Sequence, residues 1–221
     1  MRTILLIIIA VVFSALPAQA ESVYSIKHKD RVMEDYEIHI DFPNFDGLIN
    51  KNLEQEVNGQ IKSEIEETME EVKRAGEESV GIPVLYYGES SVIEDKDLIS
   101  VILISNITKG DHYASSVRSI NFENKEGGVF MNLEDVAHLD KLNVEVERKL
   151  ARDPETFKVQ NFGGVRKDTA YYINDGKLTL VFDKYEIASG VYGTPEISIP
   201  YQLVKKEKPQ HKKSVPIPKT V

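Results

Sequence analysis

The stretch that decides the fold is DGLINKNLEQEVNGQIKSEIEETMEEVKR, residues 46–74. Apolar residues recur along it at intervals of four or three, at Ile49, Leu53, Val57, Ile61, Ile65, Met69 and Val72. This spacing is typical of one face of an amphipathic helix. We therefore expect a long helix that begins near Asp46 and ends near Gly76, with a solvated acidic face opposite the apolar one.

Three β-rich segments follow this helix, at residues 83–94, 97–108 and 111–122, with short polar turns between them. Short connections favour antiparallel neighbours, so the segments predict a meander that lays one face on the helix. Before the helix, residues 32–40 alternate in polarity and predict a strand that ends at Phe42-Pro43. The expected fold class is α+β, with an antiparallel sheet meander packed on a long amphipathic helix.

The remaining sequence predicts a second, small α/β half that ends in a hairpin and a last strand. Its expected elements are a helix at 133–136 capped by Asn132, a helix at 141–151, strands at 170–173 and 177–183 around Asn174-Asp175-Gly176, and a strand at 195–201. An Asp-Gly pair between two β-rich runs is a strong hairpin signal because the turn requires positive φ.

Residues 1–20, MRTILLIIIAVVFSALPAQA, have the features of a signal peptide. Arg2 precedes an apolar run from Ile4 to Leu16, and Ala18 and Ala20 supply small residues for cleavage after Ala20. The run is shorter than the roughly 17–25 residues that span a bilayer. We expect a mature protein without a membrane span, in the periplasm or secreted from the cell.

Charge is distributed unevenly along the 221 residues. Residues 21–203 hold 20 Lys and Arg against 35 Asp and Glu, a net charge of −15, which argues against a nucleic-acid partner. Residues 204–221 hold six Lys, one Glu and three Pro. This basic segment predicts a disordered tail, either a tether for anionic wall polymers or lipids or a merely solubilising extension.

The sequence shows no pattern that declares an enzyme. Cys is absent, so thiolate metal sites and Cys nucleophiles are excluded, and the five His residues form no His-Glu-x-x-His motif. His112, next to Asp111 at a strand start, is the His with the strongest claim to a functional role. No Gly-x-Ser-x-Gly elbow accompanies it. We expect no metal, no cofactor and no catalysis, with an uncharacterised envelope enzyme as one alternative.

The C-terminal sequence FDKYEIASGVYGTPEISIPYQL, residues 182–203, resembles the end of the extracytoplasmic domain of RsiV-type anti-sigma factors. The resemblance rests on its Tyr-Glu-Ile-Ala run, its Gly-containing loop and its Ile-Pro-Tyr strand, and upstream on the Asn-Phe strand 119–122, the turn 125–127 and the helix 133–136. The sequence departs from that family in Lys109-Gly110-Asp111 before His112 and in Ser189, where many members have Pro.

The first half is similar to the companion domain of PdaC-type peptidoglycan deacetylases, through Phe42-Pro43, Ile49-Asn50 and residues 97–101. The resemblance divides the chain into a PdaC-type domain at 21–108 and an RsiV-type domain at 109–203. Because neither a deacetylase domain nor an anti-sigma segment is present, we expect a stand-alone exported binding module. The implied partner is a lysozyme-like or other basic wall-acting protein, and the alternative is cell-wall glycan.

The expected contact site is the loop 186–193 together with nearby residues. Tyr192 lies between Gly190 and Gly193, where a tyrosine offers a large contact area at small entropy cost. The other candidate contact residues are Ser189, Glu186, Tyr185 and His112. In the alternative interpretation, Tyr185, Glu186 and Ile187 form a buried corner that holds the last strand.

Overall fold

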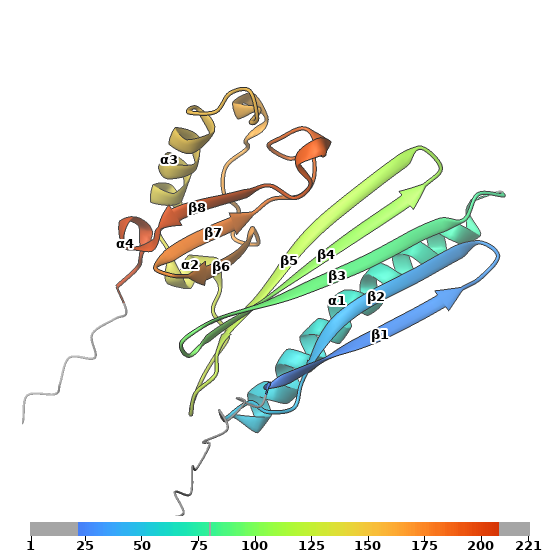
Figure 1. Ribbon diagram of the computed structural model, residues 1–221, viewed down its shortest axis with the longest axis horizontal. Helices are drawn as coiled ribbons and strands as arrows, with labels where there is room; N and C mark the ends of the chain where they lie inside the picture. The colour runs from blue at the N-terminus through green and yellow to red at the C-terminus, as the bar shows by residue number, and fades with distance from the viewer. Residues whose placement is uncertain (1–21, 80, 208–221) are drawn as a thin grey trace, which may run out of the picture.

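The computed structural model describes residues 22–79 and 81–207 (Figure 1). Its first part is a five-stranded sheet with strand order β1-β2-β3-β4-β5 and one long helix, α1. The bounds are β1 (Tyr24–Val32), β2 (Tyr36–Phe45), α1 (Lys51–Glu77), β3 (Val84–Asp95), β4 (Leu98–Lys109) and β5 (His112–Glu123). The predicted signal peptide, residues 1–20, lies outside the described residues.

Helix α1 confirms the predicted apolar stripe from Leu53 to Val72, whose members are all buried. The Asn50 side chain caps the helix by accepting hydrogen bonds from the backbone N–H groups of Asn52 and Leu53. The helix therefore begins after the expected Asp46, and Ile49 was wrongly included in the stripe: its side chain is 64% exposed. Ile49 precedes the cap, so the helical period does not set its direction.

The meander of β3, β4 and β5 is antiparallel, as predicted. The sheet as a whole is mixed, because α1 returns the chain so that β2 pairs with β3 in parallel, from Tyr36 opposite Val84 to Ile40 opposite Gly88. The sequence predicts that this strand ends at Phe42-Pro43, but β2 continues through Pro43 to Phe45. Beyond Ile40 it pairs only with β1, and a strand with one neighbour tolerates a missing N–H.

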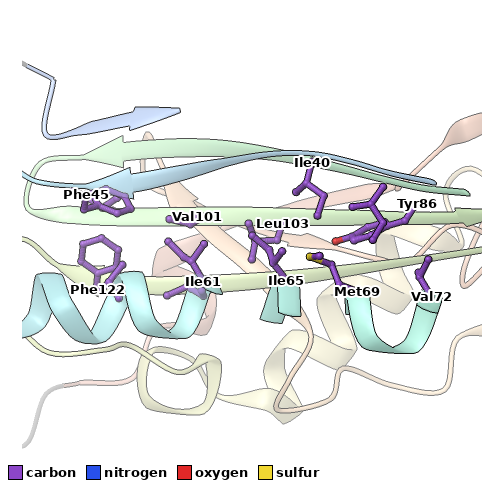
Figure 2. Close-up of a cluster of buried hydrophobic side chains, with 14 of the residues drawn as sticks. Ile40, Phe45, Ile61, Ile65, Met69, Val72, Tyr86, Val101, Leu103 and Phe122 are labelled. Atoms are coloured by element: carbon purple, nitrogen blue, oxygen red, sulfur yellow. The ribbon is translucent and has the colours of Figure 1, made fainter. Parts of the chain in front are cut away.

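The first core lies between α1 and the sheet. Figure 2 shows Ile61, Ile65 and Met69 of α1 directed at Val101 and Leu103 of β4. Phe45 and Phe122 meet edge to face in the same cluster, with ring centroids 5.4 Å apart. The apolar stripe and one face of the sheet are therefore buried against each other.

The second part contains a three-stranded sheet of order β6-β7-β8 and several short helices. The bounds are α2 (Leu133–Val136), α3 (Leu139–Leu150), η1 (Val159–Asn161), β6 (Ala170–Asn174), β7 (Lys177–Val181), η2 (Gly190–Tyr192), β8 (Glu196–Pro200) and α4 (Tyr201–Val204). The predicted hairpin is confirmed, with φ of 48° at Asp175 and 69° at Gly176. Leu142 and Val146 of α3 are buried with Leu178 and Leu180 of β7 in a second core.

The two parts meet on the face of the large sheet opposite α1. Ile102 and Val117 of that face are buried with Ala170 of β6 and Val181 of β7. The neighbours Val101 and Leu103 of Ile102 point the other way, toward α1, because side chains alternate along a strand. The predicted domain boundary lies between residues 108 and 109. The large sheet includes β5 and therefore continues past this boundary.

The ordered chain extends into the segment predicted as a disordered tail. Val204 is fully buried in the second core, and the Lys206 backbone N–H donates to the Val136 carbonyl at 2.9 Å. Residues 204–206 are therefore part of the folded unit, since an apolar side chain and a backbone pair hold them. Residues 208–221 lie outside the described residues. Across residues 22–79 and 81–207, no helix is both long and apolar enough to span a membrane.

Candidate functional site

The loop between β7 and β8 carries four of the five residues predicted to contact a partner. Its middle is anchored in the second core, where Ile187 and Ala188 are fully buried. The Lys158 N–H donates to the Ile187 carbonyl at 2.8 Å, and Phe157 forms an isolated bridge with Ala188. Buried anchors of this kind fix the backbone, so the side chains that point outward are held in defined positions.

The Glu186 carboxylate connects two parts of its own chain through hydrogen bonds. Its Oε1 accepts from the Arg166 guanidinium at 2.6 Å, and its Oε2 accepts from the Asp183 backbone N–H at 3.1 Å. Hydrogen bonding to Glu186 raises the pKa of Arg166 further. The structure thus places Glu186 between two partners of its own chain, with its side chain 21% exposed.

Asp183 joins this loop to the large sheet. Its carboxylate accepts a hydrogen bond from the Val117 backbone N–H of β5 at 2.7 Å. Burial raises the pKa of Asp183, while the bond from Val117 acts in the opposite direction. The loop is therefore attached to both sheets, through Asp183 to one and through its own strands to the other.

Tyr185 is exposed, which corrects the buried-corner interpretation for this residue. It has φ of 73°, and its side chain is 54% exposed, whereas Ile187 is fully buried as that interpretation requires. The Tyr185 ring covers Gly190 so closely that a Cβ at Gly190 would lie 2.1 Å from it. Gly190 is thus needed for packing, while Gly193, with φ of 65°, is needed for backbone conformation.

A tyrosine from β5 meets Tyr185 across the two parts of the molecule. The rings of Tyr113 and Tyr185 are in edge contact with centroids 6.2 Å apart. The Lys184 ammonium lies 4.0 Å from the Tyr113 centroid and 5.5 Å from that of Tyr185. Sequence analysis missed Tyr113 and Lys184, although Tyr113 directly follows the predicted His112.

The end of the loop is a single 3-10 turn, η2, that presents apolar side chains. Val191 is 88% exposed and Tyr192 is 49% exposed, while Ser189 is half-buried as the residue before the turn. Sequence analysis did not name Val191 as a contact residue, although an apolar residue next to Tyr192 in an expected loop could have indicated one. We call Tyr113, Lys184, Tyr185, Val191 and Tyr192 the tyrosine surface.

His112 is the first residue of β5, directly after the turn from β4. Its imidazole is 88% exposed, and its Nε2 is 3.6 Å from the Asp111 carboxylate. The neighbouring Tyr113 hydroxyl donates to the Asn106 side chain, which orients the ring toward the loop. Tyr113 therefore brings β5 to the loop, whereas the predicted His112, as its neighbour along the strand, is on the opposite face of the sheet and is not joined to the other predicted residues.

A second polar cluster lies on β1 and β2. His28 is 2.6 Å from both Asp30 and Asp41, and His39 is 2.7 Å from Asp30. The hydrogen bond to Asp41, followed by that to Asp30, raises the pKa of His28. Sequence analysis did not predict these bonds. Across the part of the chain that the structure describes, no group of His, Asp and Glu has the arrangement of a metal site.

Comparison with known proteins places the tyrosine surface largely within a recognised type of domain. Residues 131–202 match the family described as "Protein of unknown function (DUF3298)". The chain is 24% identical over 183 residues to the anti-sigma-V factor RsiV of Bacillus subtilis (strain 168). The chain is therefore similar to RsiV, and its residues 131–202 resemble the DUF3298 family. This match covers 76% of the chain and 64% of RsiV, so the chain spans less than two thirds of that relative.

A solved structure supports the fold. A crystal structure of a DUF3298 family member from Bacteroides fragilis NCTC 9343 aligns with a TM-score of 0.54, covering 84% of this chain and 94% of that one. The two sequences are 13% identical, so this likeness concerns the fold alone. Four residues of the tyrosine surface fall within residues 131–202, and Tyr113 is the fifth.

Proposed function

We propose that this chain is an exported binding module of the cell envelope that acts without catalysis and binds a lysozyme-like or other basic wall-acting protein. The observation that carries the proposal is the tyrosine surface, on a chain similar to RsiV: its Tyr185, Val191 and Tyr192 are exposed, and its Tyr113 and Lys184 are half-buried. Tyrosine contributes a large, stiff contact area and a hydroxyl, which is why it is enriched in binding sites.

The loop is preorganised for binding. Ile187 is buried, Glu186 is held by Arg166, and Asp183 is attached to β5, so Lys184 and Tyr185, which lie between these anchors, need little ordering when a partner arrives. Reduced ordering leaves more of the contact energy for affinity. The charge of −15 on residues 21–203 would also accelerate encounter with a cationic protein.

The test is a pull-down of lysozyme by the purified mature protein at low and at moderate salt. We expect specific capture that weakens but persists as salt rises, because apolar contacts of the tyrosine surface remain when charges are screened. Capture that disappears completely at moderate salt would indicate charge attraction alone. Absence of capture at either salt concentration would contradict binding to lysozyme.

Cell-wall glycan is the second candidate, favoured by the same exposed tyrosine rings, which offer faces for sugar stacking. Sedimentation with purified peptidoglycan separates the two candidates. Protein that sediments with peptidoglycan and does not capture lysozyme would replace the first proposal with this one.

Export is part of the proposal and has its own test. Cleavage after Ala20 gives a mature chain that starts at Glu21. Intact-mass analysis of protein recovered from the periplasm or the medium should give the mass of residues 21–221. Exported protein that retains residues 1–20 would contradict cleavage.

A further inference from the structure

A pocket with a volume of about 270 Å³ lies where β2 and β3 separate. The two strands pair as far as Ile40 and Gly88, and the residues just beyond, Asp41 and Glu89, line the pocket. Other parts of its wall come from α1, β4 and β5. The pocket shares no residue with the tyrosine surface, so its role is independent of the proposed function.

The floor of the pocket is apolar. Ile65 of α1, Tyr86 of β3 and Leu103 of β4 line it, and all three are buried. The Tyr86 hydroxyl is 3.1 Å from the Ser105 Oγ, which satisfies the polar atom at this depth. A Cβ at Gly88 would lie 2.8 Å from the Ile40 Cγ2 and 3.2 Å from the Tyr86 hydroxyl, so the glycine is required for this arrangement.

The rim of the pocket is acidic. Glu64, Glu67 and Glu71 follow one another along one side of α1 and line the pocket. Within residues 22–79 and 81–207, none of these three carboxylates forms an ion pair with a Lys or Arg. Arg118 is the one cationic residue among those that line the pocket.

The neighbouring acids on the same helix differ in this respect. Glu66 is 3.6 Å from the Lys62 ammonium, and Glu70 is 3.8 Å from that of Lys73. The carboxylates that line the pocket form no ion pair with a Lys or Arg in the described structure, as is also true of Glu56 elsewhere on α1. Even with Arg118 among its lining residues, the pocket has a net negative rim above an apolar floor, which is complementary to a ligand with an apolar stem and a cationic head.

We propose that this pocket binds an alkylammonium or alkylguanidinium group, with the cationic head at Glu67 and Glu71 and the alkyl stem on Ile65, Tyr86 and Leu103. A stem of four or five carbons gains from burial on the floor, while the head keeps contact with water and carboxylates at the rim. The pocket is smaller than the roughly 300–1,000 Å³ of drug-sized sites, which suits a single chain of this kind. Two sources carry this group: a free diamine and a Lys or Arg side chain of another protein.

The test is calorimetric titration of the mature protein with cadaverine, a five-carbon diamine, at low salt. We expect saturable binding, which 1-pentanol, with the same stem and no charge, does not reproduce. The double variant Glu67→Gln/Glu71→Gln should bind cadaverine at least about tenfold more weakly, because it removes both rim charges. The matched control Glu56→Gln/Glu126→Gln removes two exposed carboxylates elsewhere and should change affinity less than about twofold.

A second measurement does not depend on variants. Cadaverine should shift the backbone amide resonances of Gly88, Glu89 and Ser105 in the wild-type protein. Failure to shift them, or an equal loss of affinity in the matched control, would overturn the proposal, as would the absence of saturable binding. Nα-acetyl-lysine N-methylamide distinguishes the sources: affinity at least equal to that of cadaverine assigns the pocket to a protein side chain, and affinity tenfold lower assigns it to a free diamine.

Discussion

Helix α1 and the loop between β7 and β8 place their residues in the core by different means. Along α1 one period decides every position, and the stripe from Leu53 to Val72 is buried throughout. In the loop, Tyr185 is 54% exposed and Ile187, two residues later, is fully buried. Each loop residue is fixed by its own distant contact, so neighbours in sequence differ in both stability and accessibility. Substitutions in the two regions should therefore have effects of different size and kind.

The largest effect is expected in α1. Ile61→Asp places a charge at a position that is 1% exposed and packed against the sheet. The free energy of unfolding should fall by about 3–5 kcal/mol, enough to unfold a marginal domain. Glu67→Gln, on the exposed face, should change it by less than about 0.5 kcal/mol. Thermal or urea melts measure both, and equal melts would contradict the assigned helix face.

Within the loop, substitutions only two residues apart should have different effects on the free energy of unfolding. Ile187→Ala removes a fully buried side chain and should lower the free energy of unfolding by about 2–3 kcal/mol. Tyr185→Ala removes an exposed ring and should cost less than about 1 kcal/mol. Urea denaturation of the two variants is the measurement. A greater loss from Tyr185→Ala would restore the buried-corner interpretation.

Tyr192 should contribute to partner binding and not to the stability of the fold. Tyr192→Ala should leave the melting temperature nearly unchanged and weaken partner binding by about 1–2 kcal/mol, in the range of an aromatic hot spot. The control is Tyr87→Ala on β3, which removes another tyrosine of similar exposure, 45%, outside the tyrosine surface. Calorimetry with lysozyme compares the three proteins. Unchanged affinity in Tyr192→Ala would remove this loop from the contact surface.

The smallest effect concerns the histidines of β1 and β2. The pKa of His28 is raised from 6.5 by its bonds to Asp41 and Asp30, and the bond to His28 lowers the pKa of Asp30. A raised histidine pKa gives stabilisation that is complete below its ordinary value and is lost as pH rises through the folded value. The wild type should therefore exceed His28→Ala in melting temperature by more at about pH 6 than at about pH 8.5. A pH-independent difference would contradict this linkage.

The sequence predicts the periodic elements of the fold well. The helical stripe, the three-strand meander and the Asp-Gly hairpin depend on spacing and turn chemistry that act within a few residues. It does not predict β1, because the sequence YSIKHKDRV is charged and is half of an edge pair whose stability comes from β2. It also misplaces the end of β2, because the effect of Pro43 depends on how many neighbours the strand has.

The candidate site is predicted only in outline. Sequence alone indicates the loop and Tyr192, because glycines and a tyrosine together suggest an exposed turn. The contact between Tyr113 and Tyr185 joins β5 to the C-terminal part, and no local pattern encodes a pairing over that separation. The acidic pocket was missed for the same reason, since it forms where two strands diverge.

The bond from Val117 to Asp183 also bears on how copies of the chain avoid one another. Strand β5 is the last strand of the large sheet, and its free backbone groups would otherwise be a template for a further strand. Asp183 occupies the Val117 N–H, and Met131 donates to the Asn121 carbonyl further along the strand. Asp183 and Met131 therefore occupy part of the β5 edge, and at the other edge the Lys and Arg residues of β1, which a further strand would bury, discourage strand addition.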